Sequence, residues 1–161
     1  MKKHVKTFVA GTLILSISAC NSGSKTSENP SDTEQNTKME VSTIDFKTAE
    51  NYFVKNTVED AVPSKITTQE EFDKYFGMAT TMGDQGKPTP IDFNKEFVII
   101  VDHNSTEKKV EISPIGLNKN EKNLTFTYKL TENGDNGFTT RPFLMIIVNK
   151  TNEGNVILKK Q

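Results

Sequence analysis

Hydrophobic and polar positions alternate regularly in the second half of the chain. Residues 124–130 (LTFTYKL) alternate apolar and polar side chains, which is the pattern of a strand with one buried face. We therefore expect Thr127 and Lys129 to face solvent. Residues 97–101 (FVIIV) and 143–148 (FLMIIV) are continuously apolar and too short for ordinary helices. These two runs indicate strands that are covered on both faces.

One clear helix is predicted, opening at TTQEE and ending at Gly77. A threonine followed three residues later by glutamate is typical of a capping box, which satisfies free N–H groups of the first turn. Phe72, Tyr75 and Phe76 then fall at i, i+3 and i+4, so they form one apolar face. Gly77 is a natural helix stop.

Short strands are further predicted over 51–56, 109–113 and 156–158, with a turn over 132–137. Short connections favour antiparallel neighbours, because parallel strands need long crossovers. The expected fold class is mainly β (α+β), an antiparallel sheet or a half-barrel or sandwich with one packed helix. The helix is expected to cover one face of the apolar strands, and a second layer the other. We assign this single β-rich domain to residues 41–161.

The first residues have the pattern of an export signal. A basic head is followed by an apolar run, residues 8–15, which is too short to span a bilayer. The run ends in Ile17-Ser18-Ala19-Cys20, so residues 1–19 are predicted to be a signal peptide. This ending resembles a bacterial lipobox, which implies lipidation of Cys20 and a lipid bilayer as its partner. The expected location is the cell envelope, with the outer membrane favoured over the inner.

Residues 20–40 are predicted to be the lipidated cysteine and a disordered tether. Positions 21–38 contain no large apolar side chain, so the segment cannot offset its ordering entropy. Loss of the signal peptide removes three lysines and lowers the formal charge from −1 to −4. That charge argues against a nucleic-acid binder, which needs a basic surface. Cys20 is the only cysteine, so no disulfide is expected.

Residues with catalytic potential are sparse. His103 is the only histidine outside the signal peptide, and it lacks a second nitrogen or sulfur ligand for a metal. Its neighbour Asp102 should point to the opposite face of a strand. Glu70 and Glu71 fit the positive end of the helix dipole. No nucleophile elbow or phosphate loop occurs, so we expect no enzyme, no metal site and no cofactor.

The segment 77–90 (GMATTMGDQGKPTP) is predicted to be a long loop, since it holds three glycines and two prolines. Met78 and Met82 are flexible apolar side chains that suit adaptable binding surfaces. Long loops in compact domains are often functional. The two methionines are therefore the candidate residues for contact with a partner.

Three segments resemble a known family. They are ITTQEEFDKYFG (66–77), IDFNKEFVIIV (91–101) and RPFLMIIVNK (141–150). They resemble small exported lipoproteins of Bacteroidetes-type bacteria and the C-terminal domain of PrcB-type protease-complex subunits. A glycine-rich hairpin of that domain is replaced here by HNST (103–106). The resemblance implies a non-catalytic β domain that associates with another exported protein, such as a protease.

The predicted function is therefore that of a membrane-anchored exported lipoprotein with a protein-binding or protease-accessory domain. Two alternatives from other classes stay open. One is a small-ligand binder that uses an apolar cavity, and the other is a small hydrolase with a dispersed site.

Overall fold

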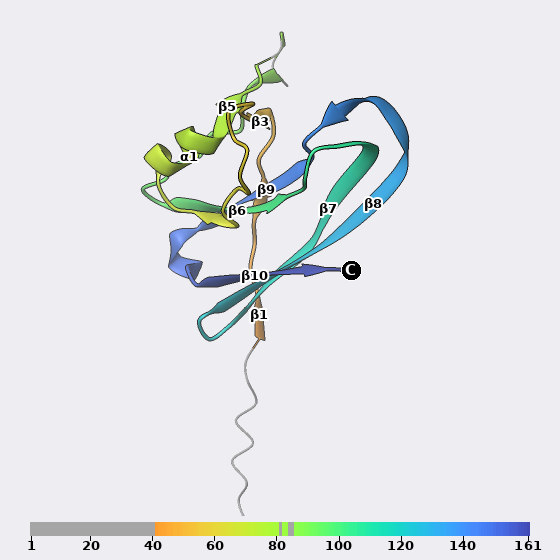
Figure 1. Ribbon diagram of the computed structural model, residues 1–161. Helices are drawn as coiled ribbons and strands as arrows, with labels where there is room; N and C mark the ends of the chain where they lie inside the picture. Colours follow the sequence, from red (N-terminus) through yellow and green to blue (C-terminus); the bar gives the residue numbers. More distant parts are fainter. Residues whose placement is uncertain (1–40, 81, 84–85) are drawn as a thin grey trace, which may run out of the picture. The chain divides into compact units, whose positions relative to one another are not determined.

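The computed structural model describes residues 41–161, apart from 81, 84 and 85, and these fall within one compact unit. The domain is mainly β, with a single α-helix in the described residues (Figure 1). Its elements are β1 (Val41–Thr43), β2 (Lys47–Thr48), β3 (Tyr52–Val54), β4 (Lys65–Ile66), α1 (Gln69–Tyr75), β5 (Phe76–Met78), β6 (Glu96–Asp102), β7 (Thr106–Asn120), β8 (Asn123–Thr140), β9 (Phe143–Asn149), η2 (Lys150–Asn152) and β10 (Asn155–Lys160). Among the described helices, none has the length and hydrophobicity needed to cross a membrane.

The strands form two four-stranded sheets and one two-stranded sheet. The first sheet has the order β1-β7-β8-β10, the second has the order β2-β9-β6-β4, and β3 pairs with β5. Neighbouring strands are antiparallel, as expected, except that β10 runs parallel to β8. The exception arises because the chain leaves the first sheet after β8, reverses into β9 of the second sheet, and reverses again into β10.

The second sheet forms the middle layer of the domain. Phe97, Ile99 and Val101 of β6 belong to a buried cluster shared with the first sheet. Val98 and Ile100, at the alternate positions, belong to a cluster shared with α1, β3 and β5. The same alternation in β9 places Leu144, Ile146 and Val148 in the first cluster and Met145 and Ile147 in the second. The prediction of two apolar strands covered on both faces is confirmed.

The helix begins as predicted but ends earlier. Thr68 is the N-cap, and its hydroxyl accepts a hydrogen bond from Glu71 N at 3.2 Å. The predicted helical position of Phe76 is wrong, because Phe76 is extended and opens β5. Gly77 is a strand residue and not a helix stop. It pairs with Phe53, whose ring lies where a Cβ would stand, 2.5 Å from Cζ.

The hairpin of β7 and β8 is longer than the sequence pattern suggests. It turns at Glu121, which has a positive φ of 53°, and pairing extends back to Thr106 and Thr140. The turn predicted over 132–137 is wrong, because these residues lie within β8. Register shifts on either side of Lys108 absorb this glycine-rich stretch and let pairing continue.

The polar side of β8 is only partly in solvent. Lys129 is exposed, as expected, but Thr127 is buried at 9% exposure. β8 is an inner strand of its sheet, and Thr127 pairs with Gly116 of β7 on one side and Lys159 of β10 on the other. A short side chain that lies between two neighbouring strands is covered from solvent even on the polar face of the sheet.

Candidate functional site

An apolar groove lies between α1, the β3–β5 pair and the segment that precedes β6. Its cavity volume is about 310 Å³. Seven of the eight lining residues are apolar or aromatic. They are Tyr52, Gln69, Phe72, Met78, Pro88, Pro90, Ile91 and Phe93. A concave apolar site of this size is suited to binding a large side chain or a small ligand.

The floor of the groove is an aromatic cluster centred on Phe72. The helix directs Phe72 inwards, where it is 3% exposed. Its ring centroid lies 5.3 Å from that of Tyr52, 5.0 Å from Phe76 and 5.4 Å from Phe93. Aromatic rings packed at these distances add to the stability gained by burial. The groove therefore has a well-packed floor.

One wall of the groove is fixed by hydrogen bonds to Thr89. Thr89 N donates to Glu50 O at 3.1 Å, and Glu50 N donates to Thr89 Oγ1 at 3.0 Å. Tyr52 OH donates to Thr89 O at 2.7 Å, and burial raises the pKa of the Tyr52 phenol. These bonds hold the flanking Pro88 and Pro90 against the β3 end of the groove.

The two methionines predicted as contact residues lie in different places. Met78 is the last residue of β5 and lines the groove, yet its side chain is 66% exposed. Met82 is fully exposed and is not among the residues that line the groove. The predicted loop is also shorter, because Gly77 and Met78 belong to β5. The partner contact itself stays a prediction for both residues.

A more polar cavity of about 480 Å³ adjoins the apolar groove and shares three lining residues with it. It is lined by Thr67, Thr68, Gln69, Ile91, Asp92, Phe93, Asn94 and Lys150. Lys150 Nζ donates to Phe93 O at 2.6 Å, which engages its charge within the domain. Asn94 N donates to Asp92 Oδ1 at 3.0 Å, and this bond lowers the pKa of Asp92. The apolar groove is thus continuous with a polar cavity that holds the ionised carboxylate of Asp92.

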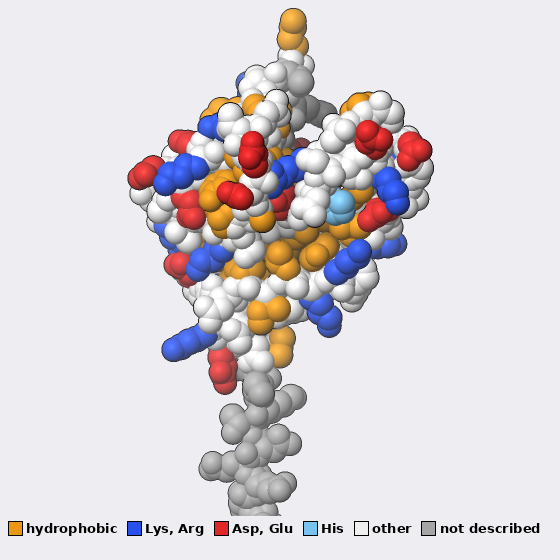
Figure 2. All heavy atoms as spheres, in the orientation of Figure 1, with side chains coloured by type: hydrophobic (Ala, Val, Ile, Leu, Met, Phe, Trp, Pro, Cys, Tyr) orange, Lys and Arg blue, Asp and Glu red, His pale blue; other side chains and the backbone are white. Residues whose placement is uncertain are grey.

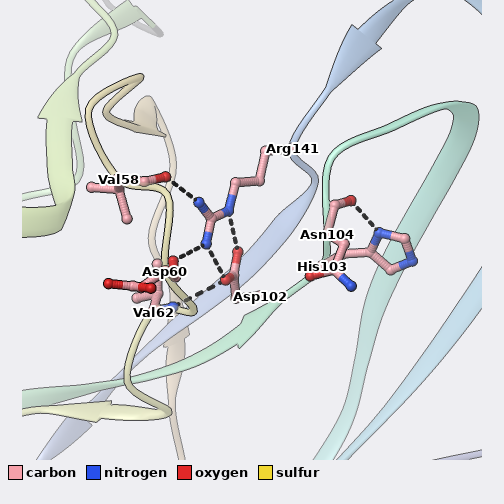
Figure 3. A network of polar contacts seen from close by, with 7 residues as sticks. All are labelled: Val58, Asp60, Val62, Asp102, His103, Asn104 and Arg141. Carbon is pink, nitrogen blue, oxygen red and sulfur yellow. Dashed lines mark hydrogen bonds and ion pairs between the residues drawn. The ribbon is translucent and has the colours of Figure 1, made fainter.

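A second group of polar side chains surrounds Arg141 (Figure 3). The guanidinium binds both carboxylate oxygens of Asp102, with Nε 3.0 Å from Oδ1 and Nη2 2.7 Å from Oδ2. It also donates to Val58 O at 2.6 Å and to Asp60 O at 2.7 Å. Val62 N donates to Asp102 Oδ2 at 3.1 Å. The hydrogen bond to Asp102 raises the pKa of Arg141, so the guanidinium stays charged.

This network fastens the irregular segment 58–62 to the end of β6 and to the connection between β8 and β9. The side chains of Arg141 and Asp102 are only 18% and 10% exposed, and their polar atoms face one another and the backbone of that segment. Such an arrangement is structural, because the charged groups are already satisfied. Sequence reasoning missed the pairing of Arg141, since the two residues are 39 positions apart.

His103 points away from this network, as expected for adjacent strand positions (Figure 3). Its Nδ1 lies 2.7 Å from Asn104 O, and its Nε2 lies 3.9 Å from Glu132 Oε1. The His103 side chain is 23% exposed and lies beside Glu132 of β8. Asp102 and His103 therefore do not form a catalytic pair.

Side chains that could bind a metal ion do not come together in the described residues. Across residues 41–161, leaving aside 81, 84 and 85, no group of three His, Cys, Asp or Glu side chains could hold a metal ion. Cys20 lies outside the described residues. Comparison with known proteins adds no function, because no family model, curated protein or solved structure matches the chain.

Proposed function

We propose that this chain is a membrane-anchored exported lipoprotein whose β domain binds another protein without catalysing a reaction. One observation carries the proposal: Met78 is largely exposed at the rim of a groove with a packed aromatic floor. Protein interfaces often centre on such a pocket, filled by an anchoring side chain of the partner. The resemblance to PrcB-type domains suggests an exported protease as the partner.

The arrangement of charges supports contact over catalysis. Arg141 and Asp102 satisfy each other, and Lys150 is engaged with the backbone of Phe93. The groove itself offers aromatic rings, prolines and a flexible thioether, which are suited to packing against an apolar side chain. A small apolar ligand is the second candidate occupant, because the cavity of about 310 Å³ is large enough to hold one.

Photocrosslinking in the native cell envelope tests the groove. A benzophenone amino acid placed at Gln69, on the groove wall, should form an adduct with one protein partner. In that background Met78→Ser should lower the adduct yield by at least about fivefold. Truncating a side chain that contributes to binding often weakens the binding free energy by more than about 1 kcal/mol, which corresponds to that factor. The matched control is Met82→Ser, which alters a fully exposed methionine outside the groove.

The folding of each variant should be checked by thermal unfolding. Both serine variants should unfold within about 1 kcal/mol of the parent, since exposed substitutions have small effects. A benzophenone at Thr43, an exposed residue of β1, gives the background yield. Equal adducts from Gln69 and Thr43, or no effect of Met78→Ser, would exclude protein binding at the groove. A small-ligand site would give that result.

The anchor is tested separately at Cys20. Wild-type protein should incorporate a clickable palmitate analogue in cells, and Cys20→Ala should incorporate none, because the lipobox cysteine is the predicted acylation site. The variant should also leave the membrane fraction, since stable attachment requires acyl chains. Equal labelling of both proteins would show that Cys20 is not the lipidated residue.

A further inference from the structure

The strand β10 forms a free edge of the first sheet. It is the last strand in the order β1-β7-β8-β10 and pairs only with β8 among the described strands. Asn155 N donates to Lys122 O at 2.7 Å, and Gln161 N donates to Tyr128 O at 2.9 Å. In a parallel ladder, alternate residues bond to the same neighbour. The intervening residues of β10 therefore turn their N–H and C=O groups towards the free edge.

Those intervening residues are Val156, Leu158 and Lys160. Exposed edge groups of this kind are a template for pairing with another strand. Many proteins protect an edge by keeping it very short or by placing charges along it. Here the strand has six residues, its charges are confined to Lys159 and Lys160, and Ile157 is 47% exposed on the outer face.

On this side of the domain the edge strands of the two sheets differ in length, with six residues in β10 and two in β4. Lys65 Nζ, in the edge strand β4, donates to Glu153 Oε1 at 3.1 Å and to Gly154 O at 3.2 Å. These bonds place β4 beside the turn that precedes β10. However, β4 has only two residues and pairs only with Val98 and Ile99 of β6. A strand of two residues therefore covers only a small part of this side of the sandwich.

Apolar side chains are only partly covered along this open side. Tyr128, Val156 and Leu158 pack against the cluster between the sheets but remain partly exposed. Figure 2 shows hydrophobic side chains gathered across the middle of this face, between β6 and β10. A strand added to β10 would place alternate side chains over this surface.

We propose that β10 accepts an extended segment of another protein as an additional antiparallel strand of the first sheet. The segment carries apolar side chains at alternate positions, which cover Tyr128, Val156 and Leu158. It carries carboxylates at its N-terminal end, which lies beside Lys159 and Lys160 in an antiparallel pair. This surface is independent of the groove at Met78.

Charge selects this occupant over a second copy of the chain. Neither Lys159 nor Lys160 forms an ion pair within the described residues. In an antiparallel pair of two β10 strands, the lysines of one copy lie opposite the region of Asn155 and Val156 in the other. That pairing leaves the four lysines uncompensated, whereas an acidic segment neutralises them.

Amide hydrogen exchange with a designed peptide tests the proposal. The protein is the full chain carrying Cys20→Ala, and the probe is acetyl-EETVTVTS-amide. At saturating peptide, exchange at Val156, Leu158 and Lys160 should slow at least tenfold, because their N–H groups become hydrogen-bonded. Exchange at Asn155, Ile157 and Lys159, whose N–H groups face β8, should not change and serves as the internal control. Unchanged exchange at all six amides would overturn the proposal.

Two sets of variants establish the geometry and the charge. N-methylation of those peptide amides that face β10 should abolish binding. N-methylation of the alternate amides, on the other edge of the peptide, should change the affinity by less than about twofold. The peptide KKTVTVTS should bind at least tenfold more weakly than the acidic one. Lys159→Glu with Lys160→Glu should reverse that preference.

The result can also identify a different occupant. If the edge amides are already protected without peptide and light scattering shows a dimer, a second copy occupies β10 and the proposal is wrong. Binding that is insensitive to N-methylation on either edge also overturns it, because strand addition requires one paired edge. Loss of crosslinking at Gln69 would leave this test unaffected, since the groove and β10 are separate surfaces.

Discussion

Replacing Ile146 by aspartate is expected to unfold the domain. Ile146 is fully buried in β9, pairs with Ile99 of β6, and lies in the cluster between the two large sheets. An aspartate there would lose the buried apolar side chain and would place a carboxylate among the apolar side chains of that cluster. We expect a cost of about 5 kcal/mol or more, comparable to the whole stability of a small domain.

Urea unfolding followed by circular dichroism measures this effect. Ile146→Val keeps an apolar residue and should cost only about 1 kcal/mol. Lys129→Asp, at an exposed position of β8, should change the stability by less than about 1 kcal/mol. Thr127 is unsuitable as the polar control because it is buried. A cooperative transition for Ile146→Asp close to that of the parent would contradict the assigned core.

The sequence predicted those features that depend on local pattern. The continuous runs at 97–101 and 143–148 indicated doubly covered strands because no polar residue interrupts them, and they form β6 and β9. The pair Thr67 and Thr68 indicated the helix start because a cap bonds to a residue only three positions away, and Thr68 is the residue that forms this bond. The helix end at Gly77 was wrong, since pairing of Phe76 with Val54 of β3 replaced a further helical turn.

Features that depend on distant segments could not be predicted in this way. Glycines near 134–137 favour a turn locally, but pairing with β7 keeps them in β8. The groove combines Tyr52, Phe72 and Phe93, which meet only through the packing of β3, α1 and the segment before β6. Met78 was a candidate contact residue from the sequence, but its place at the rim of the groove depends on the pairing of β5 with β3.

Replacing Arg141 by methionine is expected to destabilise the domain by about 3 kcal/mol. The change removes both bonds to Asp102 and leaves its largely buried carboxylate without a cation. It also removes the donors to Val58 O and Asp60 O, so the segment 58–62 loses its attachment. Breaking a buried ion pair by removing one partner typically costs about 3–5 kcal/mol, and partial exposure places this pair at the lower end.

A double-mutant cycle separates the ion pair from the rest of the network. Asp102→Leu combined with Arg141→Met should be more stable than Arg141→Met alone, because no unpaired charge remains. Arg141→Lys should retain part of the stability, since lysine keeps the charge but cannot bind both carboxylate oxygens and both carbonyls. Urea unfolding of the parent, Asp102→Leu, Arg141→Met and the double variant gives the coupling free energy. Additive effects of the two single changes would show that Asp102 and Arg141 act independently, contrary to the geometry of Figure 3.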